Sequence, residues 1–275
     1  FYQNPTCFFS AYFLKHHQPF MLRRLKTEVA KELPEKTTIE VNIDMNEQQS
    51  KLYEAVRATM QKNIRELIAA KGFHRSQIQI LSALLKLRQV CCHPSLLQLD
   101  QVKNQNVESA KLDHLLEMVQ DMVEEGRKIL IFSQFTTMLQ LIEEHLKALN
   151  IRNVKLTGQT KKRDEVITAF QTGDIPVFLI SLKAGGVGLN LTAADTVIHY
   201  DPWWNPAAED QASDRAWRIG QDKPVFVYKL ITNQSIEEKI LALQKNKADL
   251  AKSILSIDHE NEVKLSEDDV MSLLD

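Results

Sequence analysis

The 275-residue sequence contains only three cysteines, which argues against a disulfide-based fold. Cys91 and Cys92 are adjacent and Cys7 is left over, so no simple disulfide framework is available and a reducing compartment is expected. No apolar run approaches the ~18 residues of a membrane span, so no membrane partner is expected. The first residues, FYQNPTCFF, have neither an initiating Met nor the layout of a signal peptide. We therefore expect a fragment of an intracellular protein.

Charge and metal-binding motifs are also sparse. The formal net charge of -2 gives no overall attraction to nucleic acid, so any DNA contact has to come from local patches. Cys91, Cys92 and His93 suggest zinc, but adjacent residues chelate poorly and no second CxxC or HxxxH pair exists. The GxxxxGK[ST] motif that cradles nucleotide phosphates is absent as well. The sequence thus predicts no metal site and no complete nucleotide site.

Hydrophobic residues make up 44% of the sequence, enough for a sizeable core in one or two domains. Up to about residue 108 the pattern is helical, as in SQIQILSALLKLRQV, without repeated strand signals. From Arg127 onward, short apolar segments alternate with amphipathic ones. The expected strands are KILIFS, VKLTG, VFLISL, TVIHYD and VFVYKLI. This alternation predicts an α/β fold, a parallel sheet with helices on both faces, preceded by a helical arm or insertion.

We expect the chain to divide into three parts. Residues 1–108 form the helical arm, residues 109–257 form the α/β lobe, and residues 258–275 form an acidic C-terminal helix. Ser235 and Glu238 have the spacing of a capping box, which predicts the start of the last helix of the lobe.

Parallel sheets of this kind bind ligands at the carboxyl ends of their strands. The segments that follow strands are residues 133–134, 157–158, 181–188 and 201–205. Three of the eight glycines, Gly185, Gly186 and Gly188, come directly after a strand that we expect to be buried. Such glycines let the backbone approach a phosphate or sugar, or they form a tight turn without a ligand. They are no dinucleotide fingerprint, because Leu191 stands where a third glycine is needed.

Two arginines, Arg215 and Arg218, stand three positions apart. A helix predicted over residues 207–218 places both on one face, with Gln211 one turn upstream. A guanidinium suits a phosphoryl group, because its planar fork donates paired hydrogen bonds and stays charged. The alternative is a solvent-facing helix surface. If the arginines bind an anion, a partner lobe has to supply it.

A pair of tryptophans, Trp203 and Trp204, lies on a predicted loop between two prolines. An aromatic side chain there stacks on nucleic acid or wedges against it, or else one of the pair packs in the core. Lys183 either neutralises a phosphate or faces solvent. These residues make local DNA contact one interpretation of the segment and a structural role the other.

Several longer motifs together carry a resemblance. They are PFMLRRLKTEVAKELPEK, LRQVCCHP, KILIFSQFTTML, SLKAGGVGLNLTAADTVIHYDPWWNP and QASDRAWRIGQ. With them, nearly the whole sequence resembles the C-terminal RecA-like lobe of the SWI/SNF-related helicase-like ATPases, the DNA translocases of superfamily two. The resemblance implies a RecA-like fold and half of a motor that remodels chromatin or other DNA-bound proteins. In that family ATP binds between two lobes, and the first lobe holds the phosphates and Mg²⁺.

The resemblance also implies a role for particular residues. The implied catalytic residues are Arg215 and Arg218, as arginine fingers, with Gln211; the nucleotide-binding residues are Gly186, Gly188 and Asn190; the DNA-binding residues are Gln134, Gly158, Lys183, Gly185, Trp204 and Asn205. Leu182 departs from the family pattern, in which a Thr often contacts phosphate, and Ser181 is available instead.

The expected function is therefore the second motor lobe of an ATP-dependent translocase. Its expected partners are double-stranded DNA, the first lobe of the same protein and DNA-bound proteins, and its cofactors in the full-length protein are ATP and Mg²⁺. The fragment alone is expected to be inactive. Two alternatives stay open, a noncatalytic protein-binding scaffold and a lobe of a strand-separating helicase. Pro202 and Trp203 favour a bacterial or archaeal cytoplasm or nucleoid, and a eukaryotic source implies the nucleus.

Overall fold

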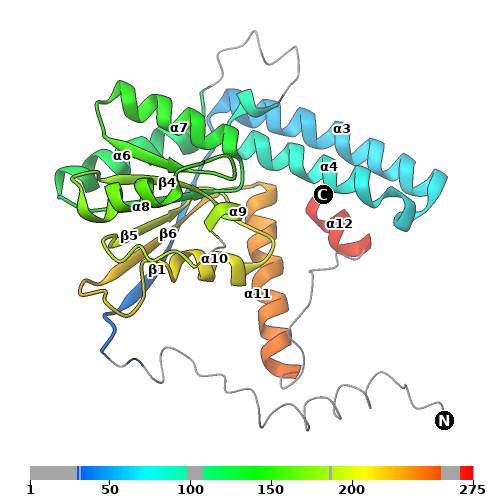
Figure 1. Ribbon diagram of the computed structural model, residues 1–275. Coiled ribbons are helices and arrows are strands. Elements are labelled where there is room, and N and C mark those ends of the chain that lie inside the picture. Colours follow the sequence, from blue (N-terminus) through cyan, green and yellow to red (C-terminus); the bar gives the residue numbers. More distant parts are fainter. Residues whose placement is uncertain (1–29, 31, 98–107, 186–187, 255–266, 275) are drawn as a thin grey trace.

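A 6-stranded sheet forms the centre of the protein (Figure 1). The computed structural model describes residues 30, 32–97, 108–185, 188–254 and 267–274, with the backbone alone at residues 185 and 246–254. The strand order is β1-β6-β5-β2-β4-β3, and every pairing is parallel. The strands are β1 (Lys36–Ile43), β2 (Ile129–Ser133), β3 (Asn153–Leu156), β4 (Val177–Ser181), β5 (Thr196–His199) and β6 (Val225–Thr232). The predicted α/β class with a parallel sheet is confirmed.

Burial along each strand follows its place in the sheet. β2 and β4 lie inside the sheet, and all their residues are buried. Their sequences, ILIFS and VFLIS, are continuous apolar runs, which are typical of parallel strands covered on both faces. β1 lies at an edge, and along KTTIEVNI its residues alternate between exposed and half-buried from the third position on, before the buried Ile43. That alternation is the pattern of a strand with one covered face.

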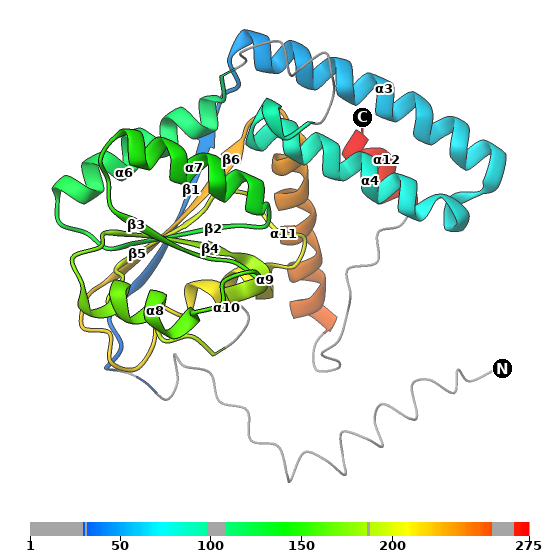
Figure 2. The same ribbon diagram turned by 45° about the horizontal axis from the view of Figure 1, so that its top comes forward.

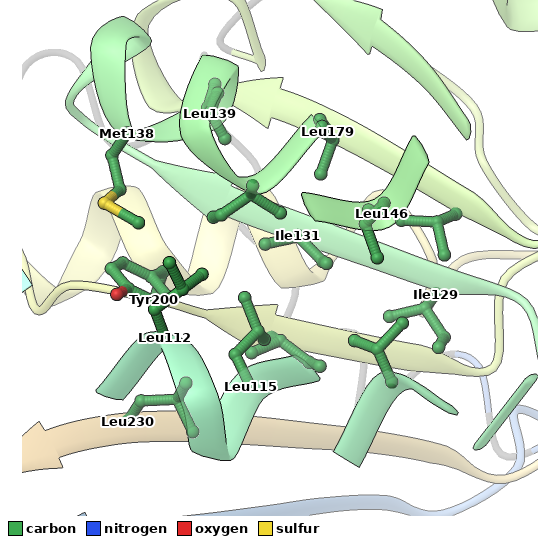
Figure 3. Packing of buried hydrophobic residues seen from close by; sticks show 14 of the residues in the cluster. Leu112, Leu115, Ile129, Ile131, Met138, Leu139, Leu146, Leu179, Tyr200 and Leu230 are labelled. Atoms are coloured by element: carbon green, nitrogen blue, oxygen red, sulfur yellow. The ribbon is translucent and has the colours of Figure 1, made fainter. Parts of the chain in front are cut away.

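Helices cover both faces of the sheet, as Figures 1 and 2 show. On one face lie α6 (Ala110–Glu124) and α7 (Thr136–Ala148); on the other lie α8 (Arg163–Thr172), α9 (Leu182–Gly185) and α10 (Pro206–Ser213). Successive side chains of a strand point to opposite faces, so β2 contributes to two cores. Ile129 and Ile131 pack with α6 and α7 (Figure 3), whereas Leu130 and Phe132 pack with α8 and α10.

A hairpin of two long helices projects beside the sheet (Figure 2). The helices are α3 (Glu47–Lys71) and α4 (Phe73–Cys92), and a 3-10 turn, η2 (Pro94–Leu96), follows them. Gly72 joins the two helices with a φ of 77°, a left-handed conformation that glycine adopts without strain. The helical arm that the sequence predicts is therefore present.

A second core joins the arm to the last helices. Leu87 of α4 packs there with residues of α11 (Ile236–Ile254) and α12 (Glu267–Leu274). Cys91 and Cys92, at the end of α4, are fully buried, and burial raises the pKa of both thiols. None of the described helices is both long and apolar enough to cross a membrane. The arm and the C-terminal helices thus share one apolar interior.

β1 contradicts one expectation from the sequence. We expected a helical region without repeated strand signals up to about residue 108, yet β1 pairs with β6 along its whole length, from Lys36 with Val225 to Ile43 with Thr232. The alternating residues of β1 are few and lie next to long helical patterns, which dominate that part of the sequence. The sheet therefore takes its edge strand from the segment before the arm. The division of the chain at residues 108 and 257 stays a prediction.

Candidate nucleotide and DNA interface

The two arginines lie on a loop, not on the predicted helix. α10 begins after Asn205, whose side chain accepts a hydrogen bond from Ala207 N–H at 3.0 Å. The helix ends at Ser213, and the backbone then closes tighter turns, in which Arg215 N–H bonds a carbonyl three residues back. The prediction of one helix over residues 207–218 was therefore wrong beyond Ser213. We call residues 214–221 the arginine loop.

Gln221 fixes the end of the arginine loop to the segment that precedes β5. Its Nε2 lies 2.7 Å from Ala194 O, 3.1 Å from Thr192 O and 3.0 Å from Ala216 O. Its Oε1 accepts hydrogen bonds from the two backbone N–H groups that follow it. One buried carboxamide thus holds the loop in place where no helix does.

The same segment also contacts Arg215 through the backbone. Leu191 N–H donates to Arg215 O at 3.0 Å. Leu191 directly follows Asn190, and both Asn190 and Gly188 are exposed. The structure therefore places Asn190 next to a residue that bonds the arginine loop, with Gly188 two positions before it in the sequence. Gly186, the third, lies outside the described residues, and the nucleotide contacts of all three stay predictions.

The two arginines differ in exposure. Arg215 is 8% exposed, whereas Arg218 and Gln211 are exposed. The pKa of Arg215 is lowered, first by burial and then by the positive charge of Arg218. The negative charge of Asp214 opposes this effect, and a bound anion would relieve the repulsion further. Arg215 and Arg218 thus interact electrostatically, with one guanidinium buried and the other exposed, and the catalytic role predicted for them and for Gln211 stays a prediction.

His199, a residue that sequence reasoning missed, holds the end of α10. Ser213 Oγ donates to Glu209 O at 3.0 Å, so it accepts from His199 Nε2 at 2.8 Å. The imidazole is buried and stacks on Phe132, with ring centroids 5.6 Å apart. Burial, followed by the charge of Lys229, lowers the pKa of His199 to about 3. A neutral histidine therefore fixes the residue from which the arginine loop starts.

Acid should weaken the fold through this histidine. In the unfolded chain its pKa is about 6.5, so between pH 6.5 and pH 3 the unfolded state binds a proton that the folded state does not. At pH 4.5 this costs about 2–3 kcal/mol of unfolding free energy relative to pH 7. We expect urea unfolding of His199→Gln to lose less stability over that interval than the parent protein. Parallel pH profiles of the two proteins would contradict the assignment.

Two of the predicted DNA-contact residues, Gln134 and Trp204, lie together at the carboxyl ends of the strands, where β2 and β5 end. Asp201, two residues after β5, is fully buried and accepts a hydrogen bond from Ser133 Oγ at 2.5 Å. The backbone N–H of Gln134 also lies 3.3 Å from its Oδ1. Burial raises the pKa of Asp201 against the opposing charge of Arg88. This carboxylate therefore orients Gln134 at the carboxyl edge of the sheet.

Arg88 of α4 contacts both Asp201 and Gln134, a role that sequence reasoning missed. Its Nη2 lies 3.5 Å from Asp201 Oδ2 and also bonds the carbonyl of Pro202. Its Nη1 donates to Gln134 Oε1 at 2.9 Å. The guanidinium carbon lies 5.4 Å from the ring centroid of Trp204 and 5.7 Å from that of Trp203. A buried arginine thus holds Gln134 and the tryptophan pair together.

Both tryptophans are half-buried. Trp204 packs against the second core, which agrees with a structural role for one of the pair, and Trp203 N–H donates to Glu209 Oε1 at 2.6 Å. An open groove of about 370 Å³ lies beside them. It is lined by Ile78, Leu81, Ser82, Leu85, Arg88, Gln134, Trp203 and Trp204. The groove leaves part of each indole available for contact.

The remaining predicted DNA contacts lie on three separate segments. Gly158, Lys183 and Asn205 are exposed, and Gly185 ends α9. Arg163 Nη2 donates to Ala184 O at 2.9 Å and so ties α9 to the start of α8. Among the described residues no group of three His, Cys, Asp or Glu side chains is arranged to hold a metal ion. The contact of these residues with DNA stays a prediction.

A RecA-like sheet, a loop that carries two arginines and an aromatic groove at the strand ends are the features expected of a helicase-like ATPase domain. The comparisons agree with that class. Residues 110–220 match the helicase conserved C-terminal domain, and residues 10–96 match the SNF2-related domain. The chain is 41% identical over 244 residues to the putative ATP-dependent helicase/translocase YwqA of Bacillus subtilis, covering 86% of this chain and 26% of the relative.

Two solved structures from Sulfolobus solfataricus are similar in fold. The SWI2/SNF2 ATPase core in complex with dsDNA has a TM-score of 0.67 and 35% identity, with 89% of this chain and 52% of that one covered. The SWI2/SNF2 ATPase C-terminal domain has a TM-score of 0.63 and 34% identity, with 82% and 91% covered. The chain belongs to the SWI/SNF-related family of helicase-like ATPases. It spans about a quarter of the length of its curated relatives.

Proposed function

We propose that this chain is the second motor lobe of an ATP-dependent translocase on double-stranded DNA. The observation that carries the proposal is the arginine loop. Its backbone is fixed by Gln221 and Leu191, so Arg215 and Arg218 start from a rigid support although no helix holds them. The family hydrolyses ATP, and this loop gives the lobe an electropositive site that suits the transferring phosphoryl group.

In this proposal the two arginines act as arginine fingers. A guanidinium that reaches the γ-phosphoryl group stabilises the negative charge that develops on it in the transition state. Arg218 is exposed and so is able to reach a nucleotide held by another lobe, whereas the buried Arg215 adds charge from behind. Gln211, the third predicted catalytic residue, is exposed two residues before the end of α10, close to the loop in the sequence.

The nucleotide itself would be held mainly by the first lobe. The sequence has no phosphate cradle, and its described part has no cluster of acidic or histidine side chains for Mg²⁺. Bound Mg²⁺ would neutralise phosphate charge during transfer. This chain's own residues fit the complementary part, in which guanidinium groups face the phosphates. On these grounds the 275-residue chain alone is expected to be inactive as an ATPase.

The DNA contact would lie at the carboxyl edge of the sheet. There Gln134, Trp203 and Trp204 are held together by Arg88, next to an open groove. Aromatic faces and amide groups suit sequence-tolerant contact with bases and backbone. A relative of known structure was solved in complex with dsDNA, which supports this choice of partner. DNA-bound proteins are then the substrates that such a motor displaces.

Helix α10 links the two proposed sites. It starts at Pro206, after the tryptophan pair and the capping residue Asn205, and ends at Ser213, directly before the arginine loop. A closure of two lobes around ATP that moves the arginine loop would therefore also shift the tryptophan end of the helix. In this way one short rigid element would couple the nucleotide to movement along DNA.

Nucleic-acid-stimulated ATP hydrolysis tests the proposal. We expect the full-length protein to hydrolyse ATP, with the rate stimulated by double-stranded DNA and little affected by RNA of equal length. A fork substrate in the same assay series should show no strand separation. Equal stimulation by RNA would contradict the DNA assignment, strand separation would favour a helicase, and absence of turnover would favour a scaffold.

A further inference from the structure

The third tryptophan, Trp217, lies between the two arginines and has a contact that the proposed function does not use. Its indole Nε1 donates to Pro34 O at 2.7 Å. The half-buried ring packs against the core that contains Phe132, on the face of the sheet covered by α8, α9 and α10. A side chain in the middle of the arginine loop therefore bonds the backbone just before β1.

Lys36 makes a second connection between the same two segments. Its Nζ lies 4.9 Å from the ring centroid of Trp217 and 3.3 Å from Asp214 Oδ1. Asp214 is the first residue of the arginine loop. We call Pro34, Lys36, Asp214 and Trp217 the clasp. The clasp thus holds the loop at its first residue and again between its two arginines.

The clasp sits where the chain enters the sheet. Glu35 O accepts from Val225 N–H at 2.9 Å, and Lys36 pairs with Val225 as the first rung of β1 and β6. The arginine loop leads within a few residues to the same rung. In the proposed motor the first lobe precedes this point in the chain. A movement of that lobe would therefore be transmitted along the backbone to the start of β1.

The ion pair of the clasp contributes little to the stability of the fold. The side chains of Lys36 and Asp214 are 24% and 31% exposed, and ion pairs at such positions contribute little to unfolding free energy. What the contacts do is fix the direction of a loop that lies beyond the end of α10 and is not part of a regular helix. Small displacements of groups that act on a transition state lower turnover strongly.

We propose that the clasp positions the arginine loop relative to the segment that enters β1, so that Trp217 and Lys36 are positioning residues for ATP hydrolysis. The inference rests on the proposed function of Arg215 and Arg218. Movement of the preceding lobe would then reach the arginines directly through Pro34 and Lys36, as well as through closure of the two lobes.

Two substitutions in the full-length protein separate this role from a structural one. Trp217→Phe keeps an aromatic ring but removes the donor to Pro34, and Lys36→Met removes the charge but keeps the alkyl chain. Each is expected to lower kcat for DNA-stimulated ATP hydrolysis about tenfold, while KM for ATP changes less than about twofold. Lys36→Arg keeps both the ion pair and the cation–π contact and should restore most of the turnover.

A double variant and a control complete the test. Because both residues act through one clasp, Trp217→Phe with Lys36→Met should lower kcat by less than the product of the single losses. Activity that falls only in step with thermal stability, or full additivity, would overturn the inference.

Arg218→Ala distinguishes a failure of the clasp inference from a failure of the proposed function. If it keeps turnover, the proposed function fails; if it is inactive while both clasp variants match the parent, only the clasp fails.

Discussion

Arg218→Ala in the full-length protein is expected to lower kcat for DNA-stimulated ATP hydrolysis by about 10³ or more. The side chain is exposed and starts from a loop fixed on both sides, by Leu191 through Arg215 O and by Gln221. Its removal therefore takes away transition-state stabilisation while leaving the fold of the loop intact. DNA affinity should remain close to that of the parent, because none of the residues lining the tryptophan groove belongs to the arginine loop.

Arg218→Lys is the matched control for charge. Lysine keeps the positive charge but loses the planar fork, so we expect turnover between that of the parent and that of the alanine variant. Single-turnover hydrolysis and DNA binding by fluorescence anisotropy measure the two quantities separately. Unchanged turnover in Arg218→Ala, or a parallel loss of DNA binding, would show that the arginine does not act as a finger.

Arg88→Met should produce the largest loss of stability. Arg88 and Asp201 are 1% and 0% exposed, and removing one partner of a buried pair leaves an uncompensated charge, which costs about 3–5 kcal/mol. The same change releases Gln134 and both tryptophans, so affinity for double-stranded DNA should fall as well. Hydrogen exchange of the amides of α4 and β5 measures the local stability in the full-length protein.

A double variant separates charge burial from loss of contacts. Asp201→Asn in the Arg88→Met background removes the remaining buried charge, so it should recover part of the lost stability. DNA affinity should not recover, because the guanidinium that contacts Gln134 and Trp204 is still missing. Recovery of both properties together would mean that the arginine acts on DNA binding only through stability.

The sequence predicted those parts of the fold whose signals are local. β2 and β4 were found because each is a short, continuous apolar run, and the helices on both faces were found from their apolar stripes. β1 was missed because its alternation is carried by few residues. The end of α10 was misplaced because nothing in the sequence marks where helical hydrogen bonds give way to tighter turns.

The residues of the candidate site that the sequence predicted are likewise those with local signals. The motifs identified Gln134, Trp204 and the arginines, all close to the strands that position them. Arg88 and Trp217 were not recognised as parts of the site, because their partners are distant in the sequence: Arg88 bonds Pro202 across 114 positions, and Trp217 bonds Pro34 across 183. Such contacts form only when the whole sheet has assembled, and they leave no periodic pattern in the sequence.

The position of β1 also bears on how the lobe can be cut for expression. A fragment begun at residue 109, where the sequence suggested a boundary, would lack the strand that pairs with β6 from Val225 to Thr232. The bare backbone of β6 would then be an open, largely apolar sheet edge, the kind of surface that recruits other chains into aggregates. A recombinant fragment begun ahead of Pro34 keeps that edge covered.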